Sequence, residues 1–502
     1  MSSGTAKAFS KKFSELRCSR TFIICTVAIA VFVDMFLYSL IIPILPTLLT
    51  ERAQVTSSKV QVALAGLLAA YNVAIVICAP ISGYFADKWS NRKMPLLGGL
   101  FALAGATVLF TLSKNLGLLY LARILQGVSA SIVWVVGLAL LVDATGSEDI
   151  GSAMGWISLG LSLGDTCGPL ISGVVYERAG HYAAFSVAFA VITVDIILRC
   201  LLLEPQSQDA STPEEVQPGQ DSAPQSIESY VLEGRSNRSA EGVPQLSDNE
   251  SGLEHRQEKD VPQGSFNIFK LLKYPDMLCS LWCIFMITVV LTGLEAVIPL
   301  HIELAFGWSS QGAGLIFVSL AIPIFLSPLI GMLSDRFGSR PLSAAGLLLA
   351  TVFGPLLALI RSFSVGRVVL LVFFLVVIGL GISLVMTPEM AVISIFSNSK
   401  AKEKPNEFGP GGATAQCCAL TTIATATAGS VGPLIAGTIQ SISGWTATSI
   451  AVGAFAALGL VPVLLKATYD RSFSQPKAED TATSSAETRD IDTTRAPMWG
   501  SK

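Results

Sequence analysis

The stretch that decides the fold is "GLSLGDTCGPLISG" at residues 160–173, whose last six residues return almost unchanged as "GPLIAG" at 432–437. Glycines four residues apart share one face of a helix and let a second helix approach closely, while proline bends a helix whose neighbours bury it. One copy fits a tight packing face in any polytopic protein, but two copies favour a duplicated, two-lobed chain. The residues concerned are Gly160, Gly164, Gly168, Pro169, Gly173, Gly432 and Pro433.

The composition places the chain in a membrane. Of 502 residues, 51% are hydrophobic and 14% are charged, and the mean hydropathy is +0.61. A helix needs roughly 20 apolar residues to cross the hydrocarbon core. Twelve runs meet this need, so we expect an all-α polytopic membrane protein with twelve transmembrane helices in two pseudo-symmetric six-helix lobes. The runs lie near 21–46, 60–84, 94–113, 117–141, 153–175, 182–203, 277–300, 311–332, 342–361, 367–396, 413–438 and 445–466.

The two sets of six runs are separated by residues 204–264, which are rich in Ser, Gln, Pro and Glu. Such a segment buries too little apolar surface to fold alone, so we expect a disordered acidic cytoplasmic linker. Residues 265–275, "SFNIFKLLKYP", predict a short amphipathic helix at the membrane surface. The domain boundaries are then a tail over 1–20, lobes over 21–203 and 265–466, and a second disordered tail over 467–502.

The orientation follows from Lys and Arg in short loops, which concentrate on the cytoplasmic side. These residues are most frequent in the N-terminal tail and in the loops after the second, eighth and tenth spans. Both termini are therefore expected in the cytoplasm. The plasma membrane and a vacuolar or vesicular membrane both remain open, because the topology relative to the cytosol is the same.

A second repeat joins spans two and three and spans eight and nine: "GYFADKWSNRK" at 83–93 and "GMLSDRFGSR" at 331–340. Both read Gly, three residues, Asp, then a basic residue. Positive-inside charge explains the bases but not the repeated Gly–Asp spacing. We expect each Asp to lie near a helix N-terminus, with the bases pairing to a neighbouring helix or to acidic lipids, as a latch of a cytoplasmic gate. The residues are Gly83, Asp87, Lys88, Arg92, Gly331, Asp335, Arg336 and Arg340.

Together these motifs resemble those of the major facilitator superfamily of transporters over nearly the whole chain. The 83–93 loop resembles the superfamily's loop 2–3 signature, except that Ser90 and Asn91 replace its usual Gly and Arg. "RILQG" resembles its fourth-helix signature through Arg123, Gln126 and Gly127. The 160–173 stretch resembles the fifth-helix signature of its antiporters, with Ser172 in place of one glycine. This resemblance implies export in exchange for protons.

The first span is similar to the vesicular amine transporters and their drug:proton antiporter relatives. In "FVDMFLYSLIIPILP", Asp34 stands nine residues before the first proline, and "TGLEAVIPLHIE" supplies Glu295 in span seven. The resemblance implies that Asp34 holds a substrate ammonium and that Glu295 serves proton coupling or substrate contact. Where that group has a lysine in span two and acids in spans ten and eleven, this chain has Tyr71, Ser383 and Thr422. This thinner charge network favours a polyspecific exporter.

Physical chemistry supports the two acids independently. A carboxylate in mid-membrane costs about 3 kcal/mol or more, so it is rarely idle. Facing a cavity, it can take a proton from one side and release it to the other, and a cationic substrate competes for the same charge. The alternative for each acid is a buried structural partner. Further candidates for lining the cavity, for which packing or local hydrogen bonding is the alternative, are Tyr38, Tyr71, Asn72, Trp134, Asp165 and Glu389, the last beside Pro388 in a bent helix that could aim it at the cavity.

The sequence thus predicts a secondary active transporter that exports small organic, cationic or lipophilic molecules in exchange for protons by alternating access. Proton-coupled or facilitative uptake, or a transporter-like sensor, stay as alternatives. No Ser–His–Asp, metal or nucleotide motif appears, so we expect neither an enzyme nor a metal, and no cofactor beyond the proton gradient. The expected partners are a small-molecule substrate, protons and the lipid bilayer, with no nucleic acid, and the expected state is a monomer.

Overall fold

The computed structural model describes residues 17, 19–88, 92–145, 149–202, 268–308, 316, 318–403 and 413–474. Within these ranges the chain is helical and holds no β-strand. The predicted linker, most of the N-terminal tail and the end of the C-terminal tail lie outside the described residues. The helices of the N-terminal group are α2 (Arg20–Leu40), α3 (Leu45–Glu51), α4 (Ser57–Lys88), α5 (Lys93–Leu112), α6 (Leu116–Ile132), η1 (Val133–Gly137), α7 (Leu138–Thr145) and α8 (Ile150–Leu201).

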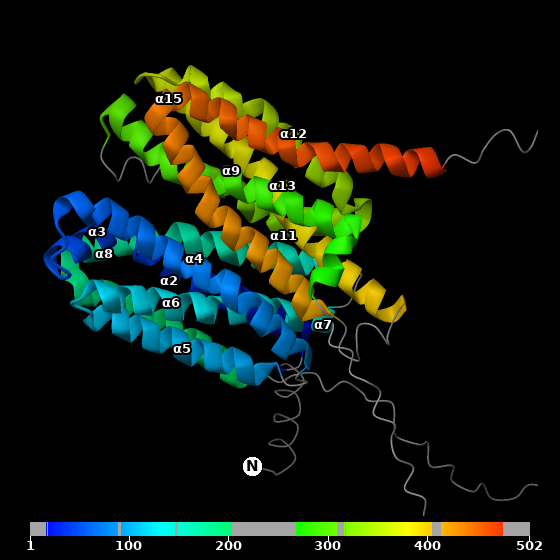
Figure 1. Ribbon diagram of the computed structural model, residues 1–502, viewed down its shortest axis with the longest axis horizontal. Helices are drawn as coiled ribbons and strands as arrows, with labels where there is room; N and C mark the ends of the chain where they lie inside the picture. The colour runs from blue at the N-terminus through cyan, green and yellow to red at the C-terminus, as the bar shows by residue number, and fades with distance from the viewer. Residues whose placement is uncertain are drawn as a thin grey trace, which may run out of the picture. The chain divides into compact units, whose positions relative to one another are not determined.

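The C-terminal group repeats this plan along the second half of the chain (Figure 1). A 3-10 helix, η2, occupies the segment predicted as a surface helix, although its Leu271 is fully buried in an apolar cluster. The elements are η2 (Ile268–Lys273), α9 (Pro275–Phe306), η3 (Ile322–Leu326), α11 (Ser327–Phe337), α12 (Ser339–Leu356), η4 (Leu357–Leu359), α13 (Val365–Glu403) and α15 (Thr414–Ser474).

Ten helices in the described part of the chain are long and apolar enough to cross a membrane. Two of these, over Ile150–Leu201 and Thr414–Lys466, have 52 and 53 residues, enough for two crossings each. Both break at a glycine with positive φ, Gly180 at 81° and Gly444 at 75°, a conformation that other residues rarely adopt. When both halves are counted, the ten helices supply the twelve expected segments.

Contacts at both ends of α8 show that the chain reverses at Gly180. Arg20, which begins α2, forms an ion pair with Asp149, the residue before α8. Arg17 donates from its Nε to the carbonyl of Leu201, the last residue of α8. Both ends of α8 therefore lie beside the start of α2, and α8 crosses the membrane twice.

The repeated glycine–proline stretch packs each lobe together in the same way. In α8, a Cβ added at Gly160 would lie 2.5 Å from the Ala28 carbonyl of α2, and one at Gly168 would lie 2.8 Å from the Phe36 carbonyl. In α15, a Cβ at Gly432 would lie 2.9 Å from the Val289 carbonyl of α9. Each copy thus lets the fifth segment of its group pack directly on the first, and this equivalence confirms the duplicated architecture.

Many large apolar side chains point outward from both groups. Ile77 is 60% exposed and Leu112 63% exposed in the N-terminal group, and Val369 is 64% exposed in the C-terminal group. A soluble protein does not leave such a continuous apolar surface in water. Apolar side chains on this outer surface fit contact with lipid tails, which accept them without a hydrophobic penalty.

Candidate functional site

Asp34 lies in the middle of α2 and is almost fully buried, with 2% of its surface exposed. Its Oδ2 accepts a hydrogen bond of 3.0 Å from Trp134 Nε1 and one of 3.2 Å from the Tyr71 hydroxyl. Both donors are neutral, and no Lys or Arg in the described ranges forms an ion pair with Asp34. The carboxyl therefore occupies a buried polar site without a cation to offset its negative charge.

Local backbone features place the two donors. Trp134 stands in η1, a π-helical turn between α6 and α7 inside one membrane span. Such turns shift the register of a helix and occur often at functional sites. Tyr71 is held by the contact of α4 with α6, where Gly127 leaves no room for a side chain: an added Cβ would lie 2.7 Å from Ala74 Cβ. Trp134 and Tyr71 thus reach Asp34 from two different helices.

An aromatic pair, Tyr38 and Tyr71, lies against Arg123, a buried cation of the N-terminal group. The rings of Tyr38 and Tyr71 lie 4.7 Å apart, and the Arg123 guanidinium carbon lies 5.4 Å from the first ring and 6.0 Å from the second. Arg123 donates to Gln126 Oε1 over 3.3 Å and is fully buried. The ring faces offset its charge by cation–π attraction in place of a carboxylate.

Asn72 lies where the two groups of helices meet. It is 8% exposed, and its side chain hydrogen-bonds to Tyr38. Its Oδ1 lies 3.7 Å from the position that a Cβ would take at Gly429 of α15. The site around Asp34 therefore reaches the surface of the C-terminal group.

Glu295 and Asp165 meet across the boundary between the groups. Asp165 belongs to α8 in the first group and Glu295 to α9 in the second, and their carboxyls hydrogen-bond to each other. Two carboxyls can form such a bond only when one of them carries the proton. Asp165 and Glu295 thus form a second acidic centre.

The two motif aspartates cap helices of the opposite group. Asp335 of α11 accepts from the backbone amides of Gly151 and Ser152 at 2.8 and 2.9 Å, at the start of α8. Asp87 of α4 accepts from the amides of Ala415 and Gln416 at 2.9 and 3.1 Å, at the start of α15. A carboxylate at a helix N-terminus binds otherwise unpaired amides and the positive end of the helix dipole. The expected placement of both aspartates near helix N-termini is confirmed.

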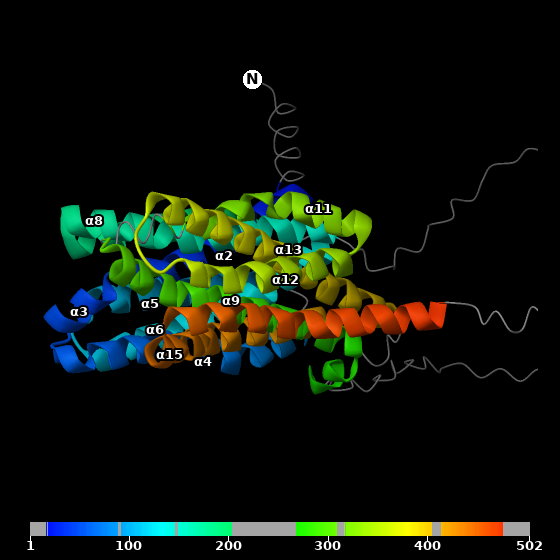
Figure 2. The ribbon, with the colours of Figure 1, turned by 90° about the horizontal axis from the view of Figure 1, so that it is seen from above.

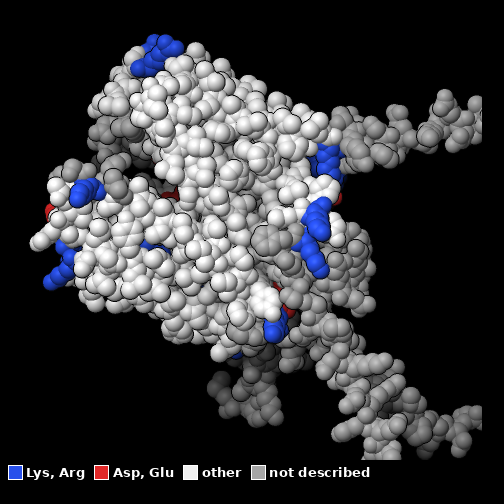
Figure 3. Space-filling view, in the orientation of Figure 1, with Lys and Arg blue, Asp and Glu red and all other residues white. Residues whose placement is uncertain are grey.

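The motif glycines make room for these caps. A Cβ on Gly83 would lie 3.1 Å from the Ala415 carbonyl, and one on Gly331 would lie 2.5 Å from the Gly151 carbonyl carbon. As a result α4 runs directly beside α15, and α11 beside α8 (Figure 1 and Figure 2). Away from these contacts, the space-filling view is hollowed between the groups on the side where α3 lies, and acidic atoms show inside the hollow (Figure 3).

Of the motif bases, Arg92 and Arg340 pair with neighbouring helices, as expected for some of them. Arg92 forms an ion pair of 2.9 Å with Asp143 of α7, and Arg340 forms one of 3.2 Å with Asp276 of α9. The Arg336 guanidinium carbon lies 5.5 Å from the centre of the Phe337 ring, and Lys88 is the last residue of α4. The pairs therefore fix the helix ends around each aspartate.

Glu389 does not join the Asp34 site. It follows Pro388 in α13 and is 5% exposed, but it lines a pocket formed only by helices of the C-terminal group, near Arg340. Of the two possibilities that the sequence left open for Glu389, the structure does not place it at the Asp34 site. The register of α13 turns this side chain toward α9 and α12.

Several residues of these contacts had no place in the sequence analysis. Gly151 and Gly155 of α8 pack on Gly331 and Ser327 of α11, and the Thr387 hydroxyl of α13 donates to the Ser158 hydroxyl over 3.0 Å. The four-residue spacing of the two glycines was the available signal for a close helix contact. The Thr387–Ser158 hydrogen bond had no comparable sequence signal, because hydroxyl residues are common in membrane helices.

The fold and these sites define a polytopic transporter with two similar helical groups around a polar interior. The sequence profile described as Major Facilitator Superfamily matches residues 27–403 and 281–500. The uncharacterized MFS-type transporter C18.02 of Schizosaccharomyces pombe is 34% identical over 434 residues, 86% of this chain and 92% of that protein. The chain therefore belongs to the Major Facilitator Superfamily, and it is a multi-pass membrane protein.

Other similarities agree with this assignment. The MFS-type transporter ppzB of Metarhizium majus is 28% identical over 82% of this chain and 92% of its own. The probable vesicular acetylcholine transporter-B of Danio rerio is 30% identical over 193 residues, 38% of this chain and 39% of that protein. The crystal structure of the human organic anion transporter MFSD10 superposes with a TM-score of 0.64 at 16% identity, covering 88% of this chain and 99% of that one, which supports the fold alone.

Proposed function

We propose that this protein exports small organic molecules, cationic or lipophilic, in exchange for protons by alternating access. The observation that carries the proposal is the environment of Asp34: buried, with two neutral donors and no paired cation. A buried carboxylate without a counter-ion is costly. A proton or a cationic substrate each offsets this cost, and since only one charge is available, binding of one displaces the other.

The Asp165–Glu295 pair supports the coupling part of this proposal. Its hydrogen bond joins the two groups of helices and requires one proton. Loss of that proton leaves two negative charges facing each other, which drives the groups apart. Protonation thus favours one arrangement of the groups, as alternating access requires.

The Asp87 and Asp335 caps act as the latch of the cytoplasmic gate in this scheme. They hold the cytoplasmic ends of the groups together, while the hollow on the α3 side stays accessible (Figure 3). Both termini then lie in the cytoplasm, in a plasma or vacuolar/vesicular membrane. The vesicular relative found over part of the chain is consistent with the second location. The transporter works as a monomer, driven by the proton gradient without a bound cofactor.

The test is transport in sealed proteoliposomes with an imposed proton gradient and a panel of labelled organic cations and neutral drugs. Wild type is compared with Asp34→Asn and with Asp149→Asn, a matched control whose side chain is 66% exposed. We expect uptake that follows the gradient, collapses with a protonophore, is lost in Asp34→Asn and is kept in Asp149→Asn. Gradient-independent equilibration that Asp34→Asn leaves unchanged would refute proton coupling and indicate a facilitator.

A further inference from the structure

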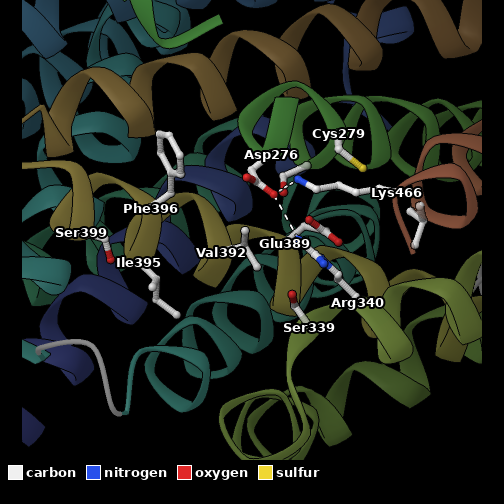
Figure 4. Close-up of a pocket in the computed structure, with 12 residues that line it drawn as sticks. Asp276, Cys279, Ser339, Arg340, Glu389, Val392, Ile395, Phe396, Ser399 and Lys466 are labelled. Atoms are coloured by element: carbon white, nitrogen blue, oxygen red, sulfur yellow. Dashed lines mark hydrogen bonds and ion pairs between the residues drawn. The ribbon is translucent and has the colours of Figure 1, made fainter. Parts of the chain in front are cut away.

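The pocket around Glu389 is a separate cavity at the end of the C-terminal group. It has a volume of about 350 Å³, within the range of small-ligand sites. Its walls come from α9, α12, α13 and α15, so it does not lie between the two groups and is not part of the central route (Figure 4). The lining residues used below are Asp276, Ser280, Arg340, Glu389 and Lys466, together with the apolar side chains of Val392, Ile395, Phe396 and Val463.

The charged groups at the rim of the pocket pair among themselves. Asp276 forms an ion pair of 3.2 Å with Arg340 and another with Lys466 (Figure 4). Glu389 is more deeply buried and forms no ion pair with any residue that the structure describes. The pocket therefore ends at a carboxylate whose charge has no directly bound counter-ion.

Comparison of the two groups makes this arrangement unusual within the protein itself. Arg92 and Arg340 each follow their motif aspartate by five residues, and Asp143 and Glu389 are each an acid of the fourth span of their group. In the N-terminal group the Arg and the acid pair at 2.9 Å. In the C-terminal group Arg340 pairs with Asp276 instead, and a cavity lies where the pair would form.

The polar atoms at the base of the pocket match one kind of cation. The Ser280 and Ser343 hydroxyls lie next to the Glu389 carboxyl. Ser280 lines the pocket, whereas Ser343 is fully buried and does not line it. The two oxygens of the Glu389 carboxylate and the Ser280 hydroxyl supply three acceptors, and a primary ammonium supplies three donors. A quaternary ammonium has no donor and would leave these oxygens unpaired.

We propose that this pocket binds a primary ammonium group through Glu389 and Ser280, with an apolar stem against Val392, Ile395, Phe396 and Val463. The ammonium offsets the buried charge, and the stem fills the apolar wall. Two sources offer this chemistry: a soluble amine from the cytosol, or the headgroup of an aminophospholipid. Arg340 is the second residue of α12, which follows α11 after the single residue Gly338. Because α11 carries Asp335, a ligand here sits beside the contact between the groups.

The test is equilibrium binding of labelled hexylammonium to the full-length protein in nanodiscs of phosphatidylcholine, in the Asp34→Asn background. This background removes the central carboxylate, so the remaining binding reports the new site. We expect saturable binding of one hexylammonium, weakened about tenfold or more by Glu389→Gln, and at least as much weaker for hexyltrimethylammonium. Ser280→Ala, which keeps the carboxylate, should weaken binding several-fold and serves where Glu389→Gln disturbs folding, as judged by its melting temperature.

The result that overturns the proposal is binding that is absent in Asp34→Asn, unchanged in Ser280→Ala and Glu389→Gln, or equal for the two probes. Nanodiscs that also contain phosphatidylethanolamine separate the sources. Competition with hexylammonium supports the lipid headgroup, and its absence supports a soluble amine. The transport assay with Asp34→Asn tests the proposed function separately. Failure of hexylammonium binding therefore leaves the proposed function untouched, and failure of the transport assay leaves this site untouched.

Discussion

The contact between α11 and α8 offers the sharpest test of how the two groups of helices are held together. At Gly331 the helices approach so closely that an added Cβ would lie 2.5 Å from the Gly151 carbonyl carbon and 2.9 Å from the Ser152 nitrogen. Both are backbone atoms, which cannot rotate away as the end of a flexible side chain can. Gly331→Ala therefore forces α11 and α8 apart or shifts the groups toward an arrangement in which this contact is absent.

The magnitude follows from the cost of overpacking. Inserting a methyl group into a tightly packed contact costs about 1–3 kcal/mol. Because the clash exists only when these helix ends meet, the whole cost acts against that arrangement. The equilibrium between the arrangement in which these helix ends meet and the one in which they are apart should then shift by about 5- to 150-fold toward the second, open form.

The measurement is a distance distribution between spin-labelled residues placed at Asp149 and Phe337, on opposite sides of this contact. The side chain of Asp149 is 66% exposed and Phe337 is 61% exposed, so the labels fit without repacking. Gly173→Ala is the matched control, since a Cβ there meets nothing within 4 Å. We expect a longer distance to gain population in Gly331→Ala alone. Distributions that are equal in wild type, Gly331→Ala and Gly173→Ala would refute the reasoning.

Three further predictions follow from the other contacts. Asp335→Asn keeps the shape of the cap but removes its charge, so the same distance measurement should show about a threefold to tenfold gain of the open form; no gain would mean that the dipole interaction is negligible. Trp134→Phe removes one of the two hydrogen bonds to Asp34 and should lower the unfolding free energy by about 1–3 kcal/mol. In the Asp34→Leu background the same substitution should cost less, and equal costs in the two backgrounds would show that the bond does not contribute to stability. Asp165→Asn still hydrogen-bonds to Glu295 but cannot share a proton, so fewer protons should move per substrate in vesicles that report both fluxes; an unchanged ratio would contradict a role in coupling.

Much of the candidate site could be read from residue types and spacing. Asp34 and Glu295 stood out because carboxylates in apolar spans are costly, and Asp87 and Asp335 because the Gly–Asp spacing recurs. In each case the signal was local, because it depended on the free energy of one carboxylate in its own stretch of sequence. Tyr71 and Trp134 could be proposed as partners of a cavity, but not as the two hydrogen-bond donors of Asp34.

What the sequence could not give is the pairing between distant segments. Asp165 was a minor candidate until the structure placed it against Glu295 on another helix. The direction in which Glu389 points stayed open because helix periodicity alone does not say which neighbours a bent helix faces. The π-turn at Trp134 also left no sequence signal.

The sequence by itself determined the twelve spans, their duplication and the identity of the polar residues that lie within the spans. These follow from local quantities: the length of an apolar run, the spacing of glycines and the cost of a buried charge. Tertiary structure alone decided which aspartate caps which helix and which carboxyls face each other across the two groups. It also decided that Arg92 pairs with Asp143, whereas Arg340 pairs with Asp276 and leaves Glu389 facing a cavity. Those outcomes depend on the relative position of helices hundreds of residues apart, and no local free energy along the chain specifies it.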